Sequence, residues 1–380
     1  MAAKIRNFRI FAAMLIVHIP SWFPIPEKPL NGNFIFRHIE SLGDSVQSVI
    51  LHHVHDGFTP ELPRNATLFP VKTGGTGKMA LVRAYETAFD ELVRQYGRSD
   101  ALHLHVALPL GPVAVRLSRK HRIPLIVSEH WTGYLPMNRP QLPLSTRLIL
   151  RHTFRNATYI TAVSQNLLDN ITLTAPPAGN KPQSVVGNVV DMGLFSLKDS
   201  TIQRDRKQIL HVSTLENNAK NIMGILHAVD ALRQRRNDFE LNIVHDFRNI
   251  LAETYVRERG LDAAVHFLGC KTSAEIAALL QTSDFFLLFS NYENQPCVLL
   301  ESFSTGTPAL TTPVGGIPEI TNRQNAVIVA PKDESQLVDK LDFMLDNSQQ
   351  FNPSEIRKQA LQICSPEVVG KKWLEIYRTL

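Results

Sequence analysis

Two carboxylates frame a short stretch of this chain that has the residue types for binding a nucleotide. Glu293 and Glu301 stand eight positions apart, with Pro296 between them. The apolar run 285–290 predicts a buried strand, and the residues from Pro296 predict a short helix that Gly306 ends. A strand that leads through a loop into a helix start is where nucleotides dock in open parallel sheets. Taken alone, the two acids are equally consistent with a solvated loop acid and an ordinary surface helix acid.

The elements around these acids complete a strand–loop–helix–strand unit. Asn294 and Gln295 directly precede Pro296 and are candidate caps for the helix. A second apolar run, 308–312, predicts the next strand, and a loop with Gly315 follows it. The carboxyl ends of both strands then lie at one edge of a sheet, which is where a ligand would bind.

The order of residues in this unit resembles the donor-nucleotide site of retaining GT-B glycosyltransferases of family four. The matched residues are Ser290, Glu293, Glu301, Gly306, Pro308, Gly315, Gly316, Ile317, Pro318 and Glu319. The resemblance implies that Glu301 holds the ribose hydroxyls and that Glu293 lies near the donor sugar and diphosphate. The other donor-binding residues that it implies are Asn294, Cys297, Val298, Gly315, Gly316 and, facing the base, Gly269.

Three further positions follow from the same resemblance. Lys220 matches a lysine that binds the diphosphate, although Thr214 stands at the position where the family usually has an arginine. His130 follows the predicted strand 123–128 and matches a histidine that contacts the donor sugar. A glycine loop with Gly32 and Asn33 matches the acceptor side of the cleft. His245 departs from the family pattern and receives no role.

The start of the chain imitates a signal peptide, but its apolar run is short and no small-residue cleavage site follows. Residues 15–18 are instead expected to form the first strand of a Rossmann-like domain. The family resemblance begins near Met14, so residues 1–13 are expected to be a dispensable extension.

The resemblance covers essentially the whole chain and implies an α/β GT-B fold, with two Rossmann-like domains facing across a cleft. The expected boundaries are residues 1–195 for an acceptor-side domain, 196–206 for a polar linker and 207–365 for a donor-nucleotide domain. Residues 366–380 are expected to form a tail helix that crosses back onto the first domain. A length of 380 residues fits two domains that each bury a core.

Charge divides unevenly between the two halves. Residues 1–190 hold 20 Lys and Arg against 11 Asp and Glu, whereas residues 191–380 hold 20 against 24. A basic first half indicates a polyanionic or anionic membrane partner, and Arg147, Arg151 and Arg155 fall on one face of a predicted helix over 144–157. A solvated helix face is the alternative. No motif for binding nucleic acid is present, so nucleic acid is not an expected partner.

Cysteine and histidine spacing predicts no metal site. Three scattered cysteines fit neither a disulfide framework nor a zinc motif, and the fourteen histidines form no HExxH pattern. A reducing cytoplasm is therefore the expected location, with attachment to the inner face of the membrane as a second expectation. No acidic pair of the DxD type lies near the donor loops, so catalysis is expected to need no metal or other cofactor.

The expected function is transfer of a sugar from a nucleotide-diphospho-sugar to a glycan or lipid-linked acceptor, with retention, in synthesis of cell-surface polysaccharide or glycolipid. Lys220, Glu293 and His130 are the expected catalytic residues. Two alternatives stay open: a sugar-nucleotide epimerase with the same architecture, and an inactive nucleotide-sugar-binding partner in a polysaccharide assembly complex. Thr214 and His245 favour the inactive partner.

Overall fold

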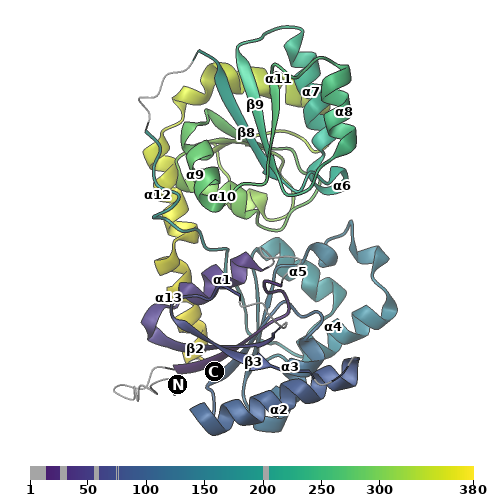
Figure 1. Cartoon of the computed structure of the whole chain (residues 1–380), viewed down its shortest axis with the longest axis vertical. Helices are drawn as coiled ribbons and strands as arrows, with labels where there is room; N and C mark the ends of the chain where they lie inside the picture. Colours follow the sequence, from purple (N-terminus) through teal and green to yellow (C-terminus); the bar gives the residue numbers. More distant parts are fainter. Residues whose placement is uncertain (1–13, 26–31, 55–59, 74, 76, 200–204) are drawn as a thin grey trace.

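Two parallel sheets, one in each half of the chain, dominate the computed structural model, which describes residues 14–25, 32–54, 60–73, 75, 77–199 and 205–380 (Figure 1). The first sheet has the order β3-β2-β1-β4-β5-β6-β7 and the second has the order β10-β9-β8-β11-β12-β13. Every recorded strand pairing in both sheets is parallel. The predicted α/β class is confirmed. The expectation about residues 1–13 lies outside the described residues.

The strands of the first sheet are β1 (Met14–Pro20), β2 (Val46–His53), β3 (Ala66–Val71), β4 (Ala101–His105), β5 (Leu125–Glu129), β6 (Tyr159–Ala162) and β7 (Gln183–Val185). Its helices are α1 (Asn33–Glu40), α2 (Lys78–Tyr96), α3 (Gly111–His121), α4 (Leu144–Asn156) and α5 (Gln165–Thr174), with 3-10 turns η1 (Gly43–Ser45), η2 (Thr132–Tyr134) and η3 (Arg139–Gln141).

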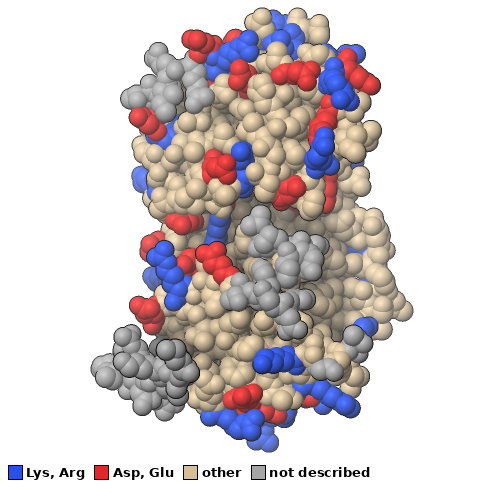
Figure 2. Space-filling model, viewed as in Figure 1, with Lys and Arg blue, Asp and Glu red and all other residues tan. Residues whose placement is uncertain are grey.

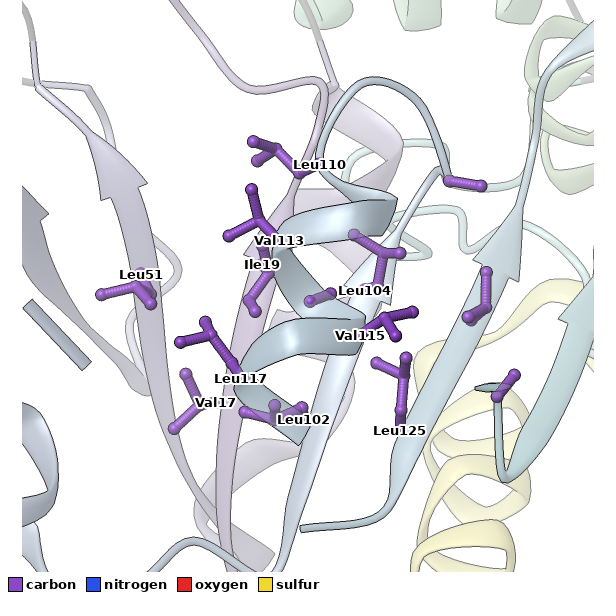
Figure 3. Close-up of a cluster of buried hydrophobic side chains, with 14 of the residues drawn as sticks. Val17, Ile19, Leu51, Leu102, Leu104, Leu110, Val113, Val115, Leu117 and Leu125 are labelled. Atoms are coloured by element: carbon purple, nitrogen blue, oxygen red, sulfur yellow. The ribbon is translucent and has the colours of Figure 1, made fainter. Parts of the chain in front are cut away.

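Apolar side chains on both faces of the central strands hold this domain together. In Figure 3, Val113 and Leu117 of α3 lie against Val17 and Ile19 of β1, with the leucines of β4 beside them. Strands that are buried on both faces have near-continuous apolar sequences, which explains why β1 and β5 were recognisable from sequence. Burial of this kind fixes the carboxyl ends of β1, β4 and β5, where the polar residues begin.

The strands of the second sheet are β8 (Lys207–Ser213), β9 (Phe239–His245), β10 (Val265–Gly269), β11 (Phe285–Leu288), β12 (Ala309–Thr311) and β13 (Ala326–Ile328). Its helices are α6 (Asn217–Lys220), α7 (Ile222–Arg233), α8 (Ile250–Glu258), α9 (Ser273–Thr282), α10 (Cys297–Ser304), α11 (Glu334–Asn347) and α12 (Pro353–Cys364), with 3-10 turns η4 (Ile317–Glu319) and η5 (Ser348–Gln350). The last helix of the chain is α13 (Pro366–Arg378).

The last helix returns to the first domain. Figure 1 shows α12 and α13 running down one side of the molecule, so that the C-terminus lies beside the first sheet. Trp373 and Tyr377 of α13 are buried among apolar residues of that sheet, including Ile16 and Ile126. The Trp373 indole Nε1 also donates a hydrogen bond to His38 Nδ1 of α1 at 3.1 Å. These contacts hold α13 against the first domain and tie α1 to it.

Candidate active site

The turn between β11 and α10 lies where the second domain meets the first. Pro296 precedes the first helical residue, Cys297, and no side chain caps the helix, so the backbone amides at its start are available to an anion. The prediction that Asn294 and Gln295 cap α10 is wrong. The Asn294 side-chain amide donates to the backbone oxygen of His130 at 2.6 Å, and Gln295 Oε1 accepts from the backbone amide of Asn188 at 2.6 Å.

Lys220 and Glu293 form an ion pair beside this helix start. Lys220 ends α6, in the connection between β8 and α7, and its Nζ lies 2.5 Å from Glu293 Oε1. The Ser290 hydroxyl donates to the same carboxylate oxygen at 2.8 Å. The Asn291 amide bonds the backbone oxygen of Ala219 at 2.8 Å, which ties the two loops together. The buried Glu293 thus has a cation and a hydroxyl beside it, as its low exposure requires.

Glu301 lies in the second turn of α10 and pairs with a residue of the other domain. Arg37 Nη1 of α1 lies 2.7 Å from Glu301 Oε1, and the Arg37 guanidinium also lies over the Phe195 ring at 5.9 Å. Burial opposes the charge on Arg37, but Glu301 outweighs this effect, so the pKa of Arg37 is raised. No sequence motif indicated Arg37, because its partner is 264 residues away.

The glycines after β12 fit closely against the acidic loop. Gly315 has a φ of +57°, and a Cβ at this position would lie 1.7 Å from the Glu293 backbone oxygen. The Gly316 amide donates to the Asn294 backbone oxygen at 2.7 Å, and a Cβ there would lie 2.6 Å from the Ser164 Cβ of the first domain. Both positions therefore require glycine for close approach.

Besides Arg37, the first domain contributes uncharged aromatic side chains to this junction. His130 follows β5, and its ring lies 4.2 Å from the ring of Phe34. Burial and the neighbouring His38 hold the pKa of His130 well below its usual value. Gly32 caps α1 with a φ of +76°, and Asn33 is the exposed first residue of that helix.

Three other predicted donor-binding positions are Gly269, Val298 and Cys297. Gly269 ends β10 with a φ of +70°, with nothing within 4 Å of a Cβ there. Val298 is half-buried in the first turn of α10. Burial, with a smaller effect of Glu301, raises the pKa of the Cys297 thiol to about 12, so this cysteine is protonated at neutral pH and is a poor nucleophile.

Both domains contribute further contacts at the junction. Glu319 accepts hydrogen bonds from the amides of Gln165 and Asn166, at the start of α5, at 2.8 and 2.9 Å. A carboxylate at a helix N-terminus is favourable because the amides there carry partial positive charge. Thr214 and His245, which depart from the family pattern, lie in the second domain. Thr214 is half-buried after β8, and the His245 ring nitrogen Nδ1 bonds the Phe247 carbonyl at 3.0 Å.

Among the described residues, one group of three side chains could hold a metal ion: His18, His103 and His105, whose ligand atoms all lie within 4.8 Å of one another. His18 Nδ1 lies 3.0 Å from His105 Nε2, and His18 Nε2 lies 3.3 Å from the Ser48 hydroxyl. Both ring nitrogens of His103 are hydrogen-bonded as well, to Tyr377 and a serine. A metal would replace at least two of these hydrogen bonds, so the side chains as they lie form a polar core network.

Comparison with known proteins identifies the class. A solved sucrose-phosphate synthase from Thermosynechococcus elongatus has a TM-score of 0.80 at 15% identity, over 96% of this chain and 98% of that chain. An Anabaena protein, HepE, solved in complex with UDP, has a TM-score of 0.75 at 17% identity, over 97% of this chain and 100% of that chain. These likenesses, with the two parallel sheets, define a GT-B fold, and the predicted fold is confirmed.

Two family models then place the chain within that class. Residues 35–186 match the glycosyl transferase 4-like domain, and residues 206–347 match glycosyl transferases group 1. This chain belongs to the family-four GT-B glycosyltransferases. A relative from Bacillus anthracis, N-acetyl-alpha-D-glucosaminyl L-malate synthase, is 28% identical over 240 residues, which is 60% of each chain. Alignments with the first curated relatives span about 60% of their length.

Proposed function

We propose that this protein transfers a sugar from a nucleoside-diphospho-sugar to a hydroxyl of a glycan or lipid-linked acceptor, with retention of configuration. The observation that carries the proposal is the meeting of Lys220, Glu293 and Glu301 around the uncapped start of α10. A cation and free amides suit a diphosphate, and a carboxylate suits a ribose diol. UDP in the structure of a protein with the same fold supports a nucleotide donor.

The proposed chemistry breaks the bond between the anomeric carbon and the β-phosphate oxygen, and the electron pair stays on that oxygen. Lys220 and the amides of Cys297 and Val298 stabilise the charge that develops there. The acceptor oxygen bonds the anomeric carbon from the same face, and its proton passes to the leaving phosphate oxygen. Glu293 and the neutral His130 orient the sugar, and the packed Gly315–Gly316 loop helps to exclude water.

A turnover assay tests this function and separates it from the alternatives. UDP-, GDP- and ADP-sugars are first screened by thermal shift, since a ligand at 100 times its Kd adds about 2.7 kcal/mol of stability. Nucleotide release is then followed with and without acceptor, and the product anomer is determined by NMR. Acceptor-dependent release with retention supports the proposal. A changed sugar nucleotide without acceptor indicates an epimerase, and binding without turnover indicates an inactive partner.

We also propose that the first domain docks on an anionic membrane through α4. Leu144 and Leu148 of this helix are 73% and 58% exposed, and both lie between positions occupied by arginine. Residues 130–168 contain four arginines and no acidic residue. Arg147 donates to two backbone oxygens, so Arg151 and Arg155 are the stripe residues left for lipid phosphates. No helix among the described residues has the length and apolar character to cross a membrane.

Arginines on the surface of the second domain provide the control for this docking proposal. Figure 2 shows Lys and Arg interspersed with acidic groups over the second domain, so arginines there make a matched control. Changing Leu144 and Leu148 to Ser and Arg151 and Arg155 to Ala is expected to reduce sedimentation with anionic vesicles strongly at low salt. Each basic residue near such a surface contributes about 1 kcal/mol. Arg257→Ala with Arg323→Ala is expected to bind like the parent; equal binding by all three proteins would refute the role of α4.

A further inference from the structure

We propose that Arg37, a residue of the first domain, positions the carboxylate that holds the nucleotide ribose in the second domain. This inference rests on the proposed function, because it assigns Glu301 to the ribose. It adds a residue from the opposite domain to the nucleotide site and so makes donor affinity depend on how the two domains are placed.

The backbone that carries Arg37 is fixed. A Cβ on Gly32, at the start of α1, would lie 2.3 Å from the Trp22 backbone oxygen, so the chain enters the helix in close contact with the β1 loop. On the next turn, His38 accepts a hydrogen bond from Trp373 of α13. Because α1 is fixed at Gly32 and at His38, the Arg37 side chain extends across the domain boundary, and its guanidinium packs over the Phe195 ring.

The pair is shielded from water. The side chains of Arg37 and Glu301 are 19% and 7% exposed, and their closest atoms lie 2.7 Å apart. A carboxylate at this depth is costly without a counter-charge, and removing one member of a buried pair leaves the other uncompensated. The other donor-site carboxylate, Glu293, receives its cation from Lys220 of its own domain. Glu301 therefore depends on the first domain in a way that Glu293 does not.

The geometry leaves room for ribose on the same carboxylate. Arg37 bonds Oε1 of Glu301, and no hydrogen bond to Oε2 is recorded within the described part of the chain. An ionised carboxylate offers about four lone-pair sites, so a diol can donate to it while the arginine stays in place. Arg37 holds the carboxylate in one orientation, and hydrogen bonds to a charged acceptor are about twice as strong as neutral ones.

A consequence for domain closure follows from this arrangement. A ligand that binds better to the state in which Arg37 reaches Glu301 must also favour that state. Nucleotide binding is therefore expected to stabilise the domain arrangement described here, and loss of Arg37 is expected to weaken that linkage.

The test measures UDP dissociation constants by calorimetry for the parent, Arg37→Ala, Arg37→Lys, Glu301→Gln and the Arg37→Ala, Glu301→Gln double variant. Arg37→Ala is expected to weaken UDP binding about tenfold, and Arg37→Lys less, because it keeps the charge. In the Glu301→Gln background, Arg37→Ala is expected to change affinity by less than about twofold, as non-additivity of coupled residues requires. Measured with 2′-deoxy-UDP, the effect of Arg37→Ala is expected to shrink in the same way.

Arg64→Ala is the matched control, since Arg64 is exposed and lines a surface pocket together with Arg37 and Glu40 of α1. Unchanged UDP affinity in Arg37→Ala overturns the inference. Tighter binding also overturns it, because Arg37 would then compete with ribose for Glu301. An equal loss of affinity in the parent and in Glu301→Gln would show that Arg37 has a merely structural role. If the parent binds UDP, GDP and ADP not at all, the proposed function itself falls, and the role of Arg37 with it.

Discussion

The two domains have the same kind of parallel sheet but fill their polar interiors differently. Beneath the junction, the first domain buries histidines that bond one another and neutral hydroxyls, with His18 between His105 and Ser48. The second domain places ion pairs at its sheet edge, of which Lys220 with Glu293 is the most buried. The difference indicates where a diphosphate can be neutralised, because Lys220 lies at the sheet edge of the second domain, whereas the buried polar groups of the first domain named here are histidines and hydroxyls.

The protonation of the histidines strengthens this contrast. Burial lowers the pKa of His18 to about 3 and that of His38 to about 4. Burial and the neighbouring histidines hold the pKa values of His103 and His105 well below the usual range. All four are neutral at pH 7, so they cannot offset phosphate charge. Arg37 is the exception on this side, and its charge is already directed at Glu301.

The largest expected difference between the two domains is in how much stability each loses at acidic pH. An unfolded chain binds a proton at each histidine as the pH falls below 6.5, whereas the fold admits none at His18 or His38 until about pH 3 and 4. Stability is therefore complete above pH 6.5 and falls as the pH drops, by about 1.4 kcal/mol per histidine per pH unit. Between pH 6.5 and 4.5, these two groups alone are expected to remove about 5 kcal/mol.

Hydrogen exchange with peptide resolution measures this difference. The first domain should lose protection before the second within that window, because burial lowers the pKa of five of its histidines, whereas His211 supplies the same effect in the second domain. His18→Gln is the variant that should flatten the pH dependence. Earlier loss of protection in the second domain would contradict the expectation that acid destabilises the first domain more.

Lys220→Ala is expected to give the next largest effect. Its charge is assigned to the diphosphate as the glycosidic bond breaks, so the loss falls on the chemical step, by about 10²–10³ in kcat. The measurement is turnover at saturating donor, after folding has been checked. Lys358→Ala removes an exposed ion pair with Glu355 and serves as the control. Parental turnover by Lys220→Ala would remove the diphosphate assignment.

Glu301→Ala is expected to have a smaller effect, and on a different parameter. Ribose lies away from the reacting carbon, so its contacts are alike in substrate and transition state, and their loss raises donor KM more than it lowers kcat. One hydrogen bond to a charged group corresponds to an increase of about 10- to 150-fold. Glu355→Ala is the comparison variant, because Glu355 lies outside the proposed donor site and its side chain is 42% exposed. If Glu301→Ala instead lowered kcat at an unchanged KM, Glu301 would act on the reaction itself.

Local patterns in the sequence predicted much of this fold. The apolar runs at β1 and β11 and the helical pattern of α4 depend on neighbouring residues, and the structure has strands and a helix there. The motif around Glu293 and Glu301 indicated which acids to consider. What it could not give was the partner of each acid, because the second domain supplies Lys220 and the first supplies Arg37.

The errors have the same long-range cause. Asn294 and Gln295 read as helix caps from their position, yet their side chains bond His130 and Asn188 across the domain boundary. The histidine network was missed although a sign was present: residues two apart on a strand share a face, as His103 and His105 do. Only the neighbouring strand, which brings His18 beside them, turns that pair into a cluster.

Metal removal is expected to have the smallest effect of all. It tests the donor site of the second domain and the histidine network of the first domain in one experiment. If Lys220 and the amides of α10 neutralise the diphosphate, EDTA should leave turnover unchanged, and added Mn²⁺ or Mg²⁺ should not raise it. A metal bound to the diphosphate would show as lost turnover that Mn²⁺ or Mg²⁺ restores, with an unchanged melting temperature of the donor-free protein. A metal held by His18, His103 and His105 would show differently, because those residues lie in the core: the melting temperature of the donor-free protein would fall with EDTA. Measuring both quantities on one sample therefore distinguishes a metal at the donor from a metal in the histidine network, and no change in either supports the division of charge between the two domains.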